Sequence, residues 1–274
     1  MIPVHSTTLP VAAPPRAEPD EQPLCAPTFT IVTSCKDDAQ TIEDCLTSVA
    51  SQTFGSFEHV VIDRHSRDDS MERIYARRDR LSIVYGNAAD SHFQAWNRGI
   101  GHASGDVIGF LDARDALADP DVLMRVANAF EDPTVSAVYG DILCVDQRDV
   151  CQVRRRCHLG PISPTRRARG WVPPTQALFV RKAWYRGIDG FAPHMRFAAD
   201  YAASLRLFSQ PSFKAVYIGE PVIRQRSAPL ALGRMLDLLK APRDEVQALR
   251  EARLGGWHAW VRHRVYKLEG WVGA

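Results

Sequence analysis

Four carboxylates in this 274-residue chain stand where they could act on a ligand. Asp63 ends FEHVVID, which is apolar toward its end, Asp112 and Asp115 follow the apolar residues VIGFL, and Asp200 lies inside FAADYAA. Carboxylates can hold a divalent cation, accept hydrogen bonds from N–H or hydroxyl groups, or take a proton. A carboxylate in an apolar stretch such as that of Asp200 is costly to bury unless it is paired or used.

The elements that must position these side chains alternate between strand and helix in the first half of the chain. Such alternation predicts an α/β protein with a mostly parallel, Rossmann-like sheet covered by helices on both faces. The carboxyl ends of parallel strands, where Asp63 and Asp112 would lie, form the ligand-binding edge, so we expect a cation or sugar-nucleotide site there. The expected strands are 28–33, 57–63, 81–85, 106–111 and 135–145, and the expected helices are 37–51, 66–78, 91–102 and 120–130.

The second half of the chain is less regular. Residues 148–169 are basic and rich in turn formers, and no element is predicted there. We expect strands at 176–181, 213–217 and 221–225, a helix at 197–208, and helix from 229 nearly to the end.

Composition excludes several classes of protein. With 34 Lys and Arg against 32 Asp and Glu, the net charge of +2 gives no case for bulk nucleic-acid binding. The sequence shows neither a membrane-spanning apolar run nor a secretory signal, so a cytoplasmic protein is expected. Residues 1–27 contain seven prolines and no apolar periodicity, which predicts a disordered tail.

Common nucleotide-binding and hydrolase motifs are absent from the sequence. The glycines Gly99, Gly101 and Gly105 follow a predicted helix instead of a strand, which argues against a dinucleotide-binding loop. There is no P-loop motif and no Gly-x-Ser-x-Gly elbow.

Taken in order, four segments resemble the family 2 glycosyltransferases of the GT-A fold, most closely members that build bacterial surface polysaccharides. The first segment resembles the opening strand, loop and helix of the family, and the second resembles its acidic turn. The third resembles the Ala-x-Asn-x-Gly helix and the strand that leads to a DxD-type motif, and the fourth resembles the acceptor-side strand and catalytic-base helix. The segments are FTIVTSCKDDAQTI with CL, SV and QTF after it, VIDRHSRD, AWNRGI with ASGDVIGFLDARD, and QALFVR with GF, AADY and LRL.

The resemblance implies one GT-A domain over residues 28–227 and an inverting transferase. Residues 28–115 would form the nucleotide-sugar-binding half and 116–227 the acceptor half, with a helical extension over 228–274. The donor would be a nucleotide-sugar, a UDP-sugar in preference, and the acceptor a hydroxyl of a saccharide or of a lipid-linked saccharide.

The resemblance also assigns site residues. Asp115 would bind a divalent cation, Mn²⁺ or Mg²⁺, with Asp112 contacting the ribose or helping the metal through water. Thr33 and Asp63 would face the nucleotide. Asp200 would be the base that takes the proton of the acceptor hydroxyl. Asn97 is interpreted as structural, tying its helix to the strand edges.

Two arginines depart from the family pattern, which often has acidic residues where Arg64 and Arg114 stand. Arg114 could pair with Asp112, could bind the donor pyrophosphate in place of the metal, or could mark a weakened enzyme. A non-catalytic nucleotide-sugar-binding or assembly subunit is therefore the alternative function.

The C-terminal segment is basic and aromatic. Residues 224–274 hold ten Lys and Arg against five Asp and Glu, a net charge of +5. Trp257, Val261, Val265 and Leu268 would share one helical face, with Trp260 beside it. Such a helix can lie in a membrane interface, on the inner face of the plasma membrane, or can pack on the domain or on a second subunit.

Overall fold

The structure is a computed structural model that describes residues 28–195, 197–226, 232–258 and 260–261. The proline-rich segment 1–27, and Val265 and Leu268 of the C-terminal segment, lie outside the described residues.

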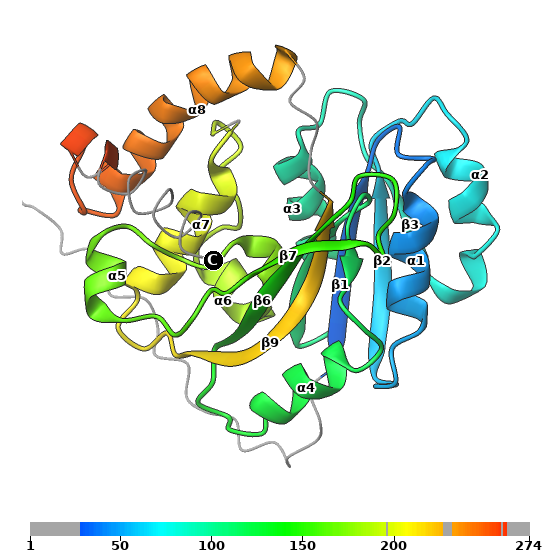
Figure 1. Ribbon diagram of the computed structural model, residues 1–274, viewed down its shortest axis with the longest axis horizontal. Helices are drawn as coiled ribbons and strands as arrows, with labels where there is room; N and C mark the ends of the chain where they lie inside the picture. Colours follow the sequence, from blue (N-terminus) through cyan, green and yellow to red (C-terminus); the bar gives the residue numbers. More distant parts are fainter. Residues whose placement is uncertain (1–27, 196, 227–231, 259, 262–274) are drawn as a thin grey trace, which may run out of the picture.

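The first half of the chain forms four parallel strands in the order β3-β2-β1-β4. The helices that connect them cover both faces of the sheet (Figure 1). This part of the fold confirms the predicted α/β architecture. The strands are β1 (Phe29–Cys35), β2 (Phe57–Asp63), β3 (Ser82–Tyr85) and β4 (Val107–Asp112), and the helices are α1 (Ile42–Ala50), α2 (Ser70–Tyr75), the 3₁₀ turn η1 (Arg78–Arg80) and α3 (His92–His102).

The second half extends the same sheet, which follows the order β3-β2-β1-β4-β8-β6-β9-β5, with β7 paired to β6. Strand β8 is antiparallel to β4 and β6, whereas β9 runs parallel to β6. The carboxyl ends of β6 and β9 therefore lie at the same edge as those of β1 to β4. The strands are β5 (Ala116–Leu117), β6 (Ala137–Val145), β7 (Val153–Cys157), β8 (Leu178–Arg181) and β9 (Ala215–Arg226), and the helices are α4 (Val122–Ala129), α5 (Pro164–Ala168), the 3₁₀ turn η2 (Thr175–Ala177), α6 (Lys182–Gly187), α7 (Ala199–Ser209) and α8 (Leu232–Glu251).

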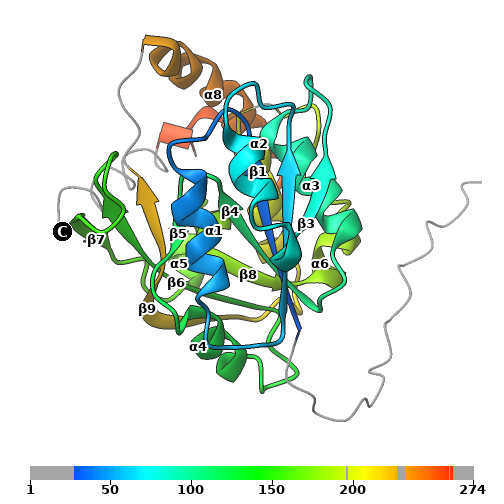
Figure 2. The ribbon, with the colours of Figure 1, turned by 90° about the vertical axis from the view of Figure 1, so that its right-hand side faces the viewer.

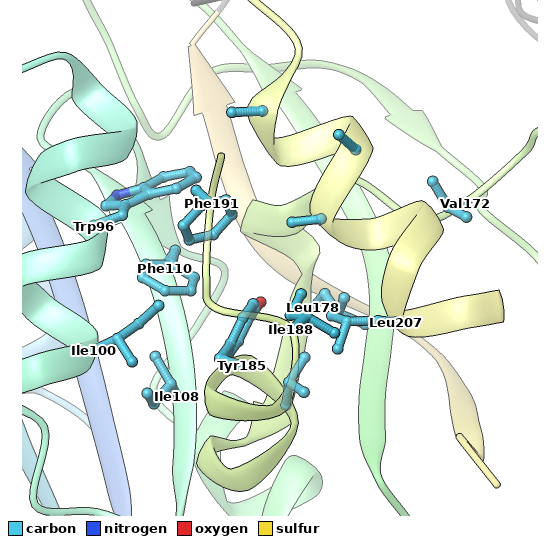
Figure 3. Close-up of a cluster of buried hydrophobic side chains, with 14 of the residues drawn as sticks. Trp96, Ile100, Ile108, Phe110, Val172, Leu178, Tyr185, Ile188, Phe191 and Leu207 are labelled. Atoms are coloured by element: carbon cyan, nitrogen blue, oxygen red, sulfur yellow. The ribbon is translucent and has the colours of Figure 1, made fainter. Parts of the chain in front are cut away.

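Each face of the sheet carries its own hydrophobic core. On one face, Trp96 from α3 packs on Phe110 of β4, with Phe191 between α3 and the second half of the chain (Figure 3). On the other face, Phe29 of β1 meets Phe54 and Phe179, under helices α1 and α4. Successive side chains along a strand point to opposite faces of the sheet, so the same strands contribute to both cores.

Helix α3 lies unusually close to β1 because Gly99 faces it. A Cβ at Gly99 would lie 2.2 Å from Cγ1 of Val32. Gly99 and Gly101 lie in the last turn of α3, which ends at His102 as predicted, and Gly105 lies in the turn before β4. Only a residue without a side chain permits this approach.

Several predicted boundaries differ from the structure for local reasons. The helix expected from Asp37 begins at Ile42, because Asp37 adopts a left-handed φ of 55°. The backbone N–H groups of residues 37–39 donate instead to side chains in the segment 66–70 that follows β2. The two strands expected at 213–217 and 221–225 are one strand, β9, with a register shift beside β6 where Gly219 has a positive φ.

Helix α8 lies above the carboxyl ends of the strands in both ribbon views (Figures 1 and 2). It is tied to the start of α7 by Asp244, whose Oδ2 accepts a hydrogen bond from the Phe197 N–H at 2.9 Å. Within the described residues, no helix combines the length and the apolar character that crossing a bilayer requires.

Candidate functional site

The strand register brings Asp63 and Asp112 to one edge of the sheet. Cys35, at the end of β1, pairs with Asp63, and its neighbour Ser34 pairs with Asp112. With neighbouring strands about 4.8 Å apart, the two aspartates lie on the order of 10 Å apart on either side of β1. We call this edge, formed by the carboxyl ends of β1, β2, β4 and β9, the rim.

Asp63 shapes the turn that follows β2. Its carboxylate accepts hydrogen bonds from the backbone N–H of His65 at 3.1 Å, from the N–H of Ser66 at 3.2 Å and from the Ser66 hydroxyl at 2.6 Å. His65 has a φ of 66°, which these contacts hold in place. Asp63 is 3% exposed, so its carboxylate is almost wholly enclosed by this turn.

The structure does not bring the Thr33 side chain to the rim. Thr33 is fully buried, with its hydroxyl 2.8 Å from Nε2 of His59 and 3.7 Å from Sγ of Cys45. Burial lowers the pKa of His59 to about 4, so this imidazole is neutral and can accept the Thr33 proton. Because side chains alternate along β1, it is Ser34 that faces the side of Asp112.

Arg114 lies among carboxylates in the turn between β4 and β5. Oδ1 of Asp112 accepts from the Arg114 backbone N–H at 3.2 Å and from its Nε at 3.5 Å, and Nε is 3.9 Å from Oδ1 of Asp38. Burial alone would lower the pKa of Arg114, but the charges of Asp112 and Asp38 outweigh burial and raise it. The guanidinium is therefore a permanent positive charge at the rim.

Asp115 is buried directly behind this turn. It is 5% exposed, and its Oδ1 accepts the backbone N–H of Arg226, the last residue of β9, at 3.0 Å. Burial, helped by the charge of Asp112, raises the pKa of Asp115 to about 7. The Arg226 side chain, 4% exposed, donates to the Arg114 carbonyl and to the Asp44 carboxylate, and so joins β9 to the rim.

Sequence reasoning missed Arg226, His92 and Asp38. His92 opens α3, and its ring lies tilted against that of Trp96 with a centroid distance of 4.2 Å. Burial lowers the pKa of His92 to about 4, with Asp112 opposing and Arg64 and Arg114 adding to this effect, which places all three near the imidazole. No local pattern marks these residues, because each acts through partners far away in the sequence.

Asp200 is half-buried in the first turn of α7. One turn later, the Ser204 hydroxyl lies 3.4 Å from that of Thr175 in η2. Strand β8 follows η2 and pairs with β4 so that Phe179 lies opposite Gly109. Continuing this register to residue 176 puts η2 beside the end of β4, so the face of α7 that carries Asp200 is linked to the rim.

Arg206 and Asn97 bond to the backbone of the loop before α7. The Arg206 guanidinium donates to the carbonyls of Ile188 and Gly190 at 2.9 and 2.6 Å. Asn97 exchanges two hydrogen bonds of 2.8 Å with the backbone of Phe191. Asn97 is thus structural, but it ties α3 to the loop before α7 instead of to a strand edge.

The rim does not fit a divalent cation at Asp115. Asp112 already has the Arg114 guanidinium against it, and Asp115 is 5% exposed with its Oδ1 taken by the Arg226 N–H. Across the described part of the chain, no group of three or more His, Cys, Asp and Glu side chains is placed to hold a metal ion.

A separate hollow of about 210 Å³ lies at the opposite end of the sheet from the rim. Leu46 of α1, Phe57 and His59 of β2, and Arg77 and Arg80 line part of its wall. None of the expected site residues lines it.

Comparison with known proteins gives consistent matches. The family described as "Glycosyl transferase family 2" matches residues 30–197. A PGL/p-HBAD biosynthesis glycosyltransferase of Mycobacterium tuberculosis is 30% identical over 211 residues, covering 71% of this chain and 75% of that protein. An uncharacterized glycosyltransferase of the same species is 31% identical over 186 residues, covering 66% and 69%.

Solved structures share the fold. Staphylococcus aureus TarS 1-349 in complex with UDP-GlcNAc superposes with a TM-score of 0.66 at 16% identity, covering 85% of this chain and 69% of that chain. The mannosyltransferase PcManGT from Pyrobaculum calidifontis, in complex with GDP-Man and Mn²⁺, superposes with a TM-score of 0.60 at 19% identity, covering 89% and 68%.

Proposed function

Because this chain belongs to glycosyl transferase family 2 and is a glycosyltransferase, we propose that it transfers a sugar from a UDP-sugar to a hydroxyl of a saccharide or of a lipid-linked saccharide. The transfer would invert the anomeric configuration and would serve surface polysaccharide or glycolipid synthesis. The observation that carries the proposal is the pairing of Ser34 with Asp112 and of Cys35 with Asp63, which opens a polar rim beside β1. A solved neighbour with UDP-GlcNAc supports the preference for uridine.

The donor would lie across the carboxyl end of β1. The Asp63 carboxylate, at the end of β2, is suited to accept the ring N–H of uracil, and Asp112 is suited to accept a ribose hydroxyl. The buried Thr33 side chain supports the strand end from within.

Asp200 would act as the base. An acceptor hydroxyl is a poor nucleophile until its proton is removed, and a carboxylate within hydrogen-bond reach can remove it as the new C–O bond forms. Direct attack by the acceptor on the anomeric carbon inverts its configuration. The link from α7 through Ser204 and Thr175 to the end of β4 supports this role for Asp200.

The C-terminal segment would bring the enzyme to a lipid-linked acceptor at the cytoplasmic face of the membrane. Trp257 and Val261, one helical turn apart, are 49% and 50% exposed, while Trp260 turns inward and donates to Glu245 at 2.6 Å. An exposed aromatic face on a basic segment is suited to a membrane interface.

The experiment is a transfer assay that measures nucleoside diphosphate released from UDP-, GDP- and dTDP-sugars with lipid-linked and free saccharide acceptors. Asp200→Asn should lower transfer by at least a hundredfold while donor affinity stays within threefold. The matched control is Asp79→Asn, an exposed aspartate on η1, which should behave as wild type.

Arg114 in the rim turn favours one alternative function, a subunit that binds nucleotide-sugar without transferring it. In that case the wild type would bind donor and release no diphosphate with any acceptor. Turnover that Asp200→Asn leaves intact would instead remove Asp200 from the role of base.

A further inference from the structure

The guanidinium of Arg114 is available to an anionic ligand. Its side chain is 43% exposed, and only Nε contacts Asp112 and Asp38. Among the residues that the structure describes, its two terminal nitrogens have no hydrogen-bond partner. Arginine presents five N–H donors in a planar fork that matches phosphate oxygens, so most of the donors of Arg114 are free for such a ligand.

Arg64, the first residue after β2, approaches the same place from the other side of β1. Its Nε is buried without a partner in the described part of the chain, where the only hydrogen bond of its side chain is a long one of 3.5 Å to the carbonyl of Asp90. The backbone N–H of Arg64 donates to the Cys35 carbonyl at 2.9 Å, and that of Ala113, next to Arg114, donates to the Ser34 carbonyl at 3.3 Å. The two arginines therefore flank the end of β1, and both act electrostatically on Asp38.

The charge at this point matches what a leaving diphosphate needs. Each phosphate of a nucleotide-sugar carries negative charge, and the leaving diphosphate gains more as the sugar departs, so a positive group must stabilise it. Two guanidiniums supply the same formal charge as one divalent cation. They can also bind phosphate oxygens in bidentate fashion.

A cation in addition to these arginines is disfavoured. A divalent ion at Asp112 would lie beside the Arg114 guanidinium, whose Nε is 3.5 Å from the Asp112 carboxylate. The second carboxylate of the turn, Asp115, is buried and accepts the Arg226 N–H.

Building on the function proposed above, we propose that Arg114, assisted by Arg64, binds the donor pyrophosphate in place of a divalent cation, so that donor binding and transfer by this enzyme require no metal.

The test is calorimetric titration of UDP into the full chain, in EDTA and in Mn²⁺, with GDP or dTDP used instead if either binds more tightly. The Kd in EDTA should lie within about threefold of the Kd in Mn²⁺. Arg114→Ala should weaken diphosphate binding about tenfold or more, while the affinity for the bare nucleoside should change less than threefold. The exposed Arg186 of α6 provides the control, because Arg186→Ala should change neither affinity.

A second variant separates loss of charge from loss of folding. Arg114→Asp places a third carboxylate in the turn, so it should lose diphosphate binding in EDTA and regain part of it in Mn²⁺. Metal-dependent rescue requires a folded site, and its absence in a variant that melts like wild type would overturn the role of position 114.

The outcomes distinguish this inference from the proposed function. Wild-type binding that appears only with Mn²⁺ would overturn the replacement of metal by arginine and would leave sugar transfer standing. Failure of UDP, GDP and dTDP to bind under either condition would overturn the proposed function itself.

Discussion

Replacing Asp115 with Asn should stabilise the protein at alkaline pH although it alters the site. Burial raises the pKa of Asp115 from the ordinary 3.8 to about 7. At about 1.4 kcal/mol for each unit of pKa, ionising this carboxyl in the folded state costs ~4 kcal/mol at pH 8. The Asp115→Asn variant avoids that cost and keeps an oxygen for the Arg226 N–H, but it buries an amide N–H₂ that costs ~1–3 kcal/mol if unbonded. The net gain at pH 8 should be ~1–3 kcal/mol.

The pH dependence of the free energy of unfolding tests the direction of this effect separately. Between pH 3.8 and 7 the folded wild type binds more protons at Asp115 than the unfolded chain does, so wild-type stability falls as pH rises through this window. The free energy of unfolding of Asp115→Asn minus that of wild type should grow by ~2 kcal/mol from pH 5.5 to pH 8. Urea unfolding in EDTA at several pH values measures it.

Asp119→Asn is the matched control. Burial alone would raise the pKa of Asp119, but its hydrogen bonds from Arg125 outweigh burial and lower it. That variant should lose stability, by an amount that stays constant over the same pH range because Asp119 titrates below it. The reasoning would be refuted if Asp115→Asn were less stable than wild type at pH 8. It would also be refuted if the difference in free energy of unfolding did not change with pH.

Further predictions concern packing, membrane binding and stereochemistry. Gly99→Ala should destabilise the fold by ~1–3 kcal/mol in urea unfolding, because the new Cβ would overlap Val32. Gly101→Ala in the same helix, where a Cβ would meet nothing within 4 Å, should stabilise it by up to ~1 kcal/mol. Equal effects of the two substitutions would contradict the close approach of α3 to β1. Trp257→Ser with Val261→Ser should reduce co-sedimentation with anionic vesicles severalfold, and unchanged binding would remove this face from membrane contact. NMR of the product of an α-linked donor should show a β-linkage, and an α-linked product would exclude direct displacement by the acceptor.

Much of the fold could be predicted because its signals are local. Strand β2 has the expected bounds, since its apolar residues 60–62 end at the charged Asp63 and mark a buried strand end. In the irregular segment 148–169 no element was predicted, but the segment contains β7. The three consecutive arginines of β7 show no strand-like alternation. Strand β7 forms through pairing with β6, which propensity does not report.

The site was predictable only where strand ends fix it. Asp63 and Asp112 follow from the rule that ligands bind at the carboxyl ends of parallel strands. Arg226 could not be found this way, because it reaches Asp115 across 111 positions of sequence. The orientation of Thr33 also depends on a buried partner, His59. Side chains alternate along β1, so a shift of one residue decides whether Thr33 or Ser34 lies on the same face of the sheet as Asp112.

The most direct test of the account is a crystal structure of the full chain with UDP, grown in EDTA. The diphosphate should lie against the Arg114 guanidinium, with the uracil N–H directed at Asp63 and no metal between them. A nucleotide bound in the hollow beside Leu46 and Arg77, or at the rim with its phosphates turned away from Arg114, would contradict it.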